Sequence, residues 1–178
     1  MLWESEFDSK PTKDMMIFME PPWSLEAGRL ESCGCSLGEE HCYLVLPIGH
    51  DSARVYVEFE FLHPRGPFFG IGFRFDSWED GDYLLWVYQT AEGDRYQLVR
   101  IYREDYQPYV VAEDTIHGLN ATGINAIELT IAGGSVELVL NGDSECRLEG
   151  IGATAQLVSI PTFHTDCSVD YMKVDRYP

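Results

Sequence analysis

The sequence predicts an all-β chain that folds as an antiparallel β-sandwich or barrel. Apolar and polar residues alternate with a period of two through most of the chain, which is typical of half-buried strands. Segments rich in glycine, asparagine, aspartate and proline separate the alternating runs and mark turns. Such regular spacing of short runs is typical of sandwiches and barrels, and we expect about ten to fourteen strands.

The clearest strand pattern lies in residues 127–131 and 136–140. Each run places leucine, isoleucine or valine at every second position, with glutamate, serine or threonine between them. Gly133-Gly134 and Asn141-Gly142 follow the two runs, and both dipeptides accept the positive φ angles of two-residue hairpin turns. These segments therefore predict an antiparallel meander with one face in the core and one in water.

The same alternation occurs earlier in the chain. Runs with alternate apolar residues cover 55–61, 69–75, 83–89 and 96–103, and loops rich in turn-forming residues separate them. Helical periodicity is weak, and only two short segments are helix candidates, residues 14–19 and residues 114–119.

Length and composition indicate one soluble domain over residues 1–178. A chain of 178 residues can bury roughly 70% of its extended surface, and no linker or repeat divides it. Its apolar stretches are far shorter than the about 20 residues that span a bilayer. The N-terminal residues lack the features of a secretory signal, which favours the cytoplasm, although a secreted protein whose signal peptide had been removed would look the same.

The charge excludes two classes of partner. The net charge is −18, from 12 basic and 30 acidic residues. Such a surface repels phosphate backbones and anionic lipids, so we expect no binding to nucleic acid or to membranes. A glycan or another neutral small ligand, a cation and a protein remain as partners, and the charge itself can serve solubility through self-repulsion.

The five cysteines, an odd number, also lean towards a reducing compartment, because at least one thiol stays outside any intramolecular disulfide. Cys33, Cys35, His41 and Cys42 include thiolate and imidazole ligands that zinc uses, but their spacing lacks the usual C-x₂₋₄-C arrangement. A local disulfide and simple buried thiols are the alternatives.

Catalytic motifs are sparse in this chain. It has no Gly-x-Ser-x-Gly nucleophile elbow, no phosphate-binding glycine loop that opens a helix, and no His-Glu-x-x-His pair. Glu58-Phe59-Glu60 places two carboxylates on one strand face about 7 Å apart, which fits the carboxylate spacing of some glycosidases. The alternative is that both glutamates belong to a solvated strand face.

The order of short motifs along the chain resembles the concanavalin A-like lectin and glucanase superfamily, including its laminin G-like branch and bacterial relatives. The motifs cover residues 7–8, 23–30, 55–61, 70–75, 83–87, 125–129, 140–142 and 169–174. The resemblance implies an antiparallel β-sandwich with jelly-roll topology, whose concave face often binds sugar in this superfamily. The Glu-x-Asp-x-Glu strand of laminarinase-type hydrolases is not matched, because Glu58-x-Glu60 is followed by Leu62, and this argues against such a hydrolase.

A non-catalytic carbohydrate-binding module is the leading functional hypothesis. Sugar recognition uses aromatic planes that stack on pyranose rings and charged groups that bind hydroxyls. The candidate residues, expected opposite the core, are Tyr56, Glu58, Glu60, Arg74, Trp86 and Tyr88. The alternative for Trp86 and Tyr88 is a place in the core or beneath a loop. The alternative functions are a structural or protein-interaction domain and a glycoside hydrolase that uses Glu58 or Glu60.

A structural Ca²⁺ is the one cofactor that the sequence suggests. Jelly-roll domains often pair their first and last strands, which would bring Glu6 and Asp8 near Asp170. Two or three carboxylates with backbone carbonyls can supply the six to eight oxygen ligands that calcium takes. The alternative is that these acids are ordinary surface charges, since no Asp-x-Asp-x-Asp loop is present.

Overall fold

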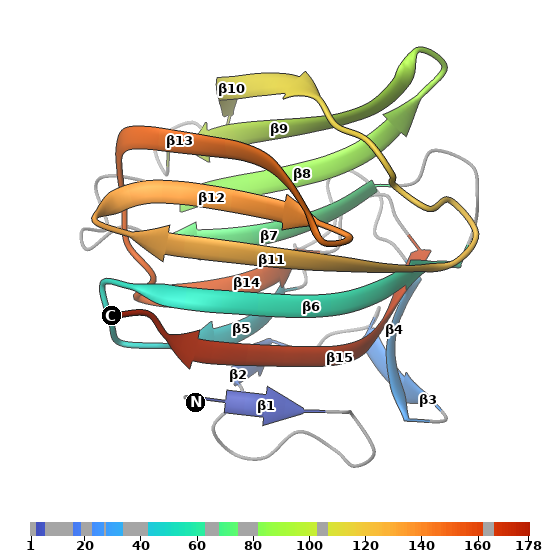
Figure 1. Cartoon of the computed structure of the whole chain (residues 1–178). Coiled ribbons are helices and arrows are strands. Elements are labelled where there is room, and N and C mark those ends of the chain that lie inside the picture. The colour runs from blue at the N-terminus through green and yellow to red at the C-terminus, as the bar shows by residue number, and fades with distance from the viewer. Residues whose placement is uncertain are drawn as a thin grey trace.

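The computed structural model describes residues 3–5, 16–18, 23–26, 28–33, 43–62, 68–74, 82–102, 107–161 and 166–178. These residues form fifteen β-strands in two stacked antiparallel sheets, which we name sheet A and sheet B (Figure 1). The predicted antiparallel sandwich is therefore confirmed, with slightly more strands than expected. In this part of the chain no helix is long and apolar enough to cross a membrane.

Sheet A has eight strands. Seven follow one another in space in the order β13 (Asp143–Ala153), β12 (Gly134–Leu140), β11 (Ile124–Ala132), β6 (Ala53–Phe61), β15 (Asp166–Arg176), β4 (Arg29–Cys33) and β3 (Trp23–Glu26). The eighth, β1 (Trp3–Ser5), pairs with β15 through Trp3 opposite Val174 and Ser5 opposite Met172.

Sheet B has seven strands. Their order in space is β10 (Pro108–Thr115), β9 (Gly93–Ile101), β8 (Asp82–Thr90), β7 (Phe68–Arg74), β14 (Leu157–Pro161), β5 (Tyr43–Pro47) and β2 (Met16–Phe18).

The path of the chain combines two local meanders with two strands that are inserted late. Strands β7 to β10 are neighbours in sheet B and β11 to β13 are neighbours in sheet A, as Figure 1 shows. Strand β14 then lies between β7 and β5, and β15 lies between β6 and β4. The expected contact between the first and last strands is present, and Tyr171 of β15 donates a hydrogen bond to Glu4 of β1.

The two predicted hairpin turns are confirmed. Gly133 and Gly134 have φ angles of 57° and 75°, and Asn141 and Gly142 have φ angles of 51° and 92°. Positive φ at both central residues gives a turn whose twist matches that of the flanking strands. Asn141 is the one non-glycine residue with positive φ in the described part of the chain.

The core lies between the two sheets and is built by the alternation seen in the sequence. The inward side chains of β6, β7, β8, β11 and β12 belong to one buried cluster. Phe59 of sheet A stacks on Phe69 of sheet B, with ring centroids 3.8 Å apart. The hydroxyl of Tyr83 in sheet B donates to the carbonyl of Ile151 in sheet A at 2.9 Å, so a buried polar group also joins the sheets.

The two helix candidates are wrong where the structure describes them. Residues 16–18 form β2, and residues 114–115 end β10, with irregular backbone over residues 116–120. Pairing with neighbouring strands determines these short segments more strongly than their own weak periodicity. Residues 35, 41 and 42 of the cysteine-rich segment lie outside the described residues, while Cys146 and Cys167 carry thiols.

Candidate functional site

The outer face of sheet B carries the two candidate aromatic residues of β8. Leu85 and Val87 point into the core, so Trp86 and Tyr88, which alternate with them, point away from it. Both aromatic side chains are half-buried, and neither belongs to the core cluster. The alternative that they form part of the core between the sheets is therefore wrong.

The strands on either side of β8 surround Trp86 with different groups. On the β7 side its cross-strand neighbour is Gly70, which has no side chain to stand beside the indole. On the β9 side its neighbour is Gln97, whose Nε2 donates to Glu113 Oε2 at 3.0 Å. Trp86, Gln97 and Glu113 thus form one row of outward side chains across β8, β9 and β10.

A second row passes through Tyr88 and Arg95, which lie opposite each other on β8 and β9. The Nε atom of Arg95 is buried and has no hydrogen-bond acceptor among the described residues. A buried guanidinium N–H without an acceptor is costly, so an incoming hydroxyl or carbonyl oxygen would be favoured at this position. The outer face of sheet B therefore offers the aromatic rings of Trp86 and Tyr88, the Nε–H donor of Arg95, and the paired amide and carboxylate of Gln97 and Glu113.

The same face is sheltered at one end. Leu84 and Val99, opposite each other on β8 and β9, are 2% and 0% exposed although they lie outside the core cluster. Gly72 on β7 is the other neighbour of Leu84, and Ser159 of β14 occupies the space that a Cβ of Gly72 would need. Gly72 thus provides room for the close approach of a side chain of the next strand.

The outer face of sheet A carries the other aromatic and acidic candidates, Tyr56, Glu58 and Glu60 of β6. The hydroxyl of Tyr56 donates to Glu58 Oε1 at 2.7 Å. Burial, and then this hydrogen bond to Glu58, raise the pKa of Tyr56 to about 12. Arg29 Nη1 donates to Glu60 Oε2 at 3.2 Å, so each of the two glutamates already has a partner within the protein.

Asp170 completes an ionic cluster on this face. Its side chain is 17% exposed, and its Oδ1 lies 3.0 Å from Arg29 Nε, without the alignment of a hydrogen bond. Burial raises the pKa of Asp170; Arg29 acts to lower it, and Glu60 and Glu58 add to the rise. The bulge in β15 between Val169 and Tyr171 explains the position, because it interrupts the pairing with β6 at this residue.

The six predicted sugar-binding residues therefore do not form one site. Tyr56, Glu58 and Glu60 lie on sheet A, whereas Trp86 and Tyr88 lie on sheet B, and the two outer faces point away from each other. The hypothesis of a single face fails because β6 and β7, although consecutive in the chain, belong to different sheets. Arg74 is the last residue of β7, opposite Asp82, and the structure does not describe its side chain.

Sequence reasoning missed Arg95, Gln97 and Glu113 on sheet B and Arg29 on sheet A. The alternation of β9 already places Arg95 and Gln97 on the face opposite Tyr96 and Leu98, so their orientation could have been predicted. Their position beside Trp86 depends on the register of the β8–β9 hairpin, which the Thr90 to Gly93 turn determines.

For the calcium hypothesis, the structure describes only Asp170 of its three ligands, since Glu6 and Asp8 lie outside the described residues. Asp170 faces Arg29 on the outer side of sheet A. Among the described residues, no group of three or more histidine, cysteine, aspartate or glutamate side chains has the arrangement of a metal site.

Comparison with known proteins places this arrangement in a recognised fold. No family model matches the sequence, and no curated protein matches it. Solved structures do match over nearly the whole chain. A protein of unknown function with a galectin-like fold from Bacillus subtilis has a TM-score of 0.70 at 13% identity, with 98% of this chain and 95% of that chain covered.

Two further structures match at similar level. The carbohydrate binding module CBM66 from Bacillus subtilis has a TM-score of 0.62 at 12% identity, covering 88% of this chain and 92% of its own. SCLam, a non-specific endo-β-1,3(4)-glucanase from family GH16, has a TM-score of 0.63 at 11% identity. The match covers 99% of this chain and 91% of that chain. The chain therefore has the concanavalin A-like jelly-roll fold, as the order of its motifs indicated.

Proposed function

We propose that this protein is a non-catalytic carbohydrate-binding module that holds a glycan on the outer face of sheet B. The observation that carries the proposal is the pair Trp86 and Tyr88, which point outward from β8 beside Arg95 and Gln97. Aromatic rings supply apolar planes for sugar C–H groups, and the guanidinium and amide supply hydrogen bonds to hydroxyls. A carbohydrate-binding module among the similar structures supports the same class of ligand.

The sheet B face suits this role better than the sheet A face. On sheet A the two glutamates of β6 already have partners, since Tyr56 donates to Glu58 and Arg29 donates to Glu60. The buried oxygens of Asp170 beside them accept no hydrogen bond from the described residues, but a carboxylate there can only accept. No aromatic residue of the described strands lies opposite Asp170, whereas Tyr88 lies opposite Arg95 on sheet B. On sheet B the Nε of Arg95 has no acceptor among the residues described, and a sugar hydroxyl would supply one. Binding on sheet B would supply an acceptor for an unmet donor, whereas binding at Glu58 or Glu60 would have to displace existing hydrogen bonds.

The test is a glycan array probed with the purified protein, followed by titration calorimetry with the best ligand. Arg95→Gln should weaken binding by about tenfold, which is the cost of one charge-assisted hydrogen bond. Arg54→Gln, a matched loss of one charge on the sheet A side, should leave the affinity unchanged. Equal losses in the two variants would refute the sheet B site.

A protein-interaction domain is the second candidate, and the edge strand β10 favours it. Tyr109, Val110 and Val111 are 48%, 54% and 41% exposed, and among the described strands β10 pairs only with β9. An exposed apolar edge strand can add a strand from a partner. Light-scattering mass of the wild type and of Val110→Lys tests for self-association through this edge, since a lysine should abolish any dimer.

A glycoside hydrolase that uses Glu58 or Glu60 is the third candidate. Family GH16 glucanase is among the similar structures, and Asp170 with its raised pKa lies near both glutamates. A raised carboxyl pKa is what a general acid requires. If hydrolysis of an array ligand is detected, either Glu58→Gln or Glu60→Gln must abolish it, and activity that survives both changes excludes this role.

A further inference from the structure

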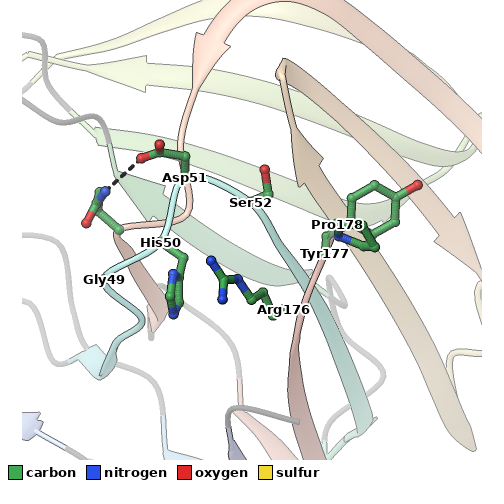
Figure 2. A pocket seen from close by; sticks show the side chains of 8 residues that line it. Gly49, His50, Asp51, Ser52, Arg176, Tyr177 and Pro178 are labelled. Carbon is green, nitrogen blue, oxygen red and sulfur yellow. Dashed lines mark hydrogen bonds between the residues drawn. The ribbon is translucent and has the colours of Figure 1, made fainter.

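A hollow at one end of the sandwich is separate from both sheet faces. It has a volume of about 620 Å³ and is lined by the β5–β6 connection, by Gln156 and by the end of β15 (Figure 2). The backbone N–H groups of Ile48 and Gly49 both donate to the carbonyl of Gln156 at 3.0 Å. These bonds join the β5–β6 connection to the β13–β14 connection, and both connections cross from one sheet to the other. Backbone contacts therefore build the wall of the hollow.

Arg176 reaches this hollow from an unusual position in β15. It lies opposite Ala53 and two residues after the buried Val174, so it continues the inward-facing series of the strand. The strand ends at this residue, and the guanidinium points into the hollow instead of the core (Figure 2). Among the described residues no carboxylate forms an ion pair with it, although the chain has 30 acidic residues.

The other lining groups combine hydrogen-bond donors with acceptors. His50 points into the hollow beside Arg176, and Ser52 adds a hydroxyl. The carboxylate of Asp51 turns towards Gln156, whose Nε2 donates to Asp51 Oδ1 at 2.9 Å (Figure 2). Within the described part of the chain, the second carboxylate oxygen of Asp51 and the amide oxygen of Gln156 accept no hydrogen bond and can accept one from a ligand.

This distribution matches a ligand that carries both a carboxylate and hydroxyl groups. A guanidinium binds carboxylates through two parallel N–H donors, and an imidazole adds a third donor. The acceptors on Asp51 and Gln156 match hydroxyl donors, which an anion such as sulfate lacks. The volume is within the range of small-ligand sites, about 300–1,000 Å³, and is larger than a bare oxyanion requires.

The net charge of −18 does not prevent such binding. At physiological ionic strength charges beyond about 8 Å are largely screened, so an anion senses mainly the groups that line the hollow. Asp175, the residue before Arg176, does not line the hollow, and its carboxylate is paired with Lys173 Nζ at 2.7 Å, which offsets its charge.

We propose that this hollow is a second binding site, specific for a sugar acid such as a uronic acid, with the carboxylate on Arg176 and His50 and hydroxyls on Asp51 and Gln156. The inference goes beyond the glycan site proposed on sheet B, because the two sites share no residue.

The test is titration of the full ¹⁵N-labelled chain with glucuronate and galacturonate at constant ionic strength, followed by NMR. Saturable shifts should appear at residues 49–52, 156 and 176–177. Glucose, which lacks the carboxylate, and acetate, which lacks the ring, should each bind at least about tenfold more weakly. Sulfate serves as the probe for an oxyanion site without hydroxyl recognition.

Variants separate this site from the rest of the molecule. Arg176→Gln should weaken uronate binding at least about tenfold, with His50→Gln as a second variant if the first is poorly folded. Arg147→Gln, an equal charge change on β13, should have no effect, and Trp86→Ala should leave uronate binding intact even if it abolishes glycan binding. The proposal is overturned if no saturable shifts occur, if acetate or sulfate binds as well as uronate, or if Arg176→Gln binds normally.

Discussion

The buried amide oxygen of Asn125 accepts a hydrogen bond from Nδ2 of Asn141 at 3.3 Å, which ties the start of β11 to the turn between β12 and β13. Asn125 is 0% exposed and also accepts from the backbone N–H of Asn120 at 2.7 Å. Its own amide donates to the carbonyls of Asn120 and Gly123 at 2.8 and 3.2 Å. One side chain thus satisfies the backbone of the loop that leads into sheet A.

Replacing this amide should be costly. Asn125→Leu would remove the partner of two N–H donors, from Asn120 and Asn141 Nδ2, and of two carbonyl groups. We expect it to lower the free energy of unfolding by about 2–4 kcal/mol. Urea unfolding measures the loss. Asn120→Ala is the control, because it removes only one exposed hydrogen bond, to the N–H of Thr122, and should cost less than about 1 kcal/mol. Equal losses would contradict a structural role for the buried amide.

Gly72 should tolerate no side chain while Ser159 is present. A Cβ at this position would overlap Ser159 Oγ and would lie 2.9 Å from Leu84 Cδ2. We expect Gly72→Ala to destabilise the fold by about 1–3 kcal/mol, as overpacking does. Combining it with Ser159→Ala, which removes the nearest atom, should recover part of the loss in thermal unfolding. Simple additivity of the two changes would argue against this contact.

Asp170 should make stability depend on pH in a defined direction. The pKa of Asp170 is raised in the folded protein, so folding disfavours its charged form. The resulting loss of folding stability begins as the pH rises above the unfolded pKa of about 4. It is complete above the pKa of the folded state. Asp170→Asn should therefore stabilise the protein by about 1 kcal/mol at pH 7 and make no difference below about pH 4. Urea unfolding at both pH values checks this, and a variant less stable at pH 7 would show that the Arg29 ion pair outweighs burial.

Trp86→Ala should abolish glycan binding, with at least about a tenfold loss of affinity, and leave far-UV circular dichroism and the melting temperature nearly unchanged. Loss of stacking removes binding energy, whereas no cavity opens in the core because Trp86 lies on the outer face. Tyr56→Ala, an aromatic truncation on the opposite face, should bind glycan normally. Destabilisation by about 3–5 kcal/mol, typical of truncating a buried Trp, would place Trp86 in a structural role instead.

The calcium site at Glu6, Asp8 and Asp170 stays a prediction. A Ca²⁺ ion that binds only the folded chain should raise the melting temperature in millimolar CaCl₂ relative to EDTA at matched ionic strength. Asp170→Ala should remove the shift. An unchanged midpoint in the wild type, or a shift that persists in the variant, would eliminate this site.

Local patterns predicted the strands and their inward residues well, because alternation needs only neighbouring positions. Leu85 and Val87 of β8 face the core as expected, and Gly133-Gly134 and Asn141-Gly142 form the predicted turns. Such patterns do not show which strands share a sheet. The crossover from β6 to β7 joins two different sheets, but in the sequence it is a short polar connection like that of a hairpin within one sheet.

Other features depend on geometry that strict alternation hides. A regular strand would place Val169 and Tyr171 on the same face, but the bulge of β15 turns Tyr171 outward, 5.9 Å from Tyr56, and keeps Met172 in the core. The hollow at the sandwich end combines His50, Gln156 and Arg176 from three distant segments. No periodic signal links such positions, so only the folded chain brings them together.

The places of β14 and β15 also have a consequence for how the molecule is made. Each joins a local meander to strands from the first 50 residues, β14 between β7 and β5 and β15 between β6 and β4. During synthesis the meanders can form as soon as they leave the ribosome. The strands that flank the positions of β14 and β15 lack a partner on that side until residues 157–176 emerge. The nascent chain therefore exposes the unpaired edges of β4, β5, β6 and β7 until its last strands are made, and chaperones that cover these edges should matter more for this protein than its final stability suggests.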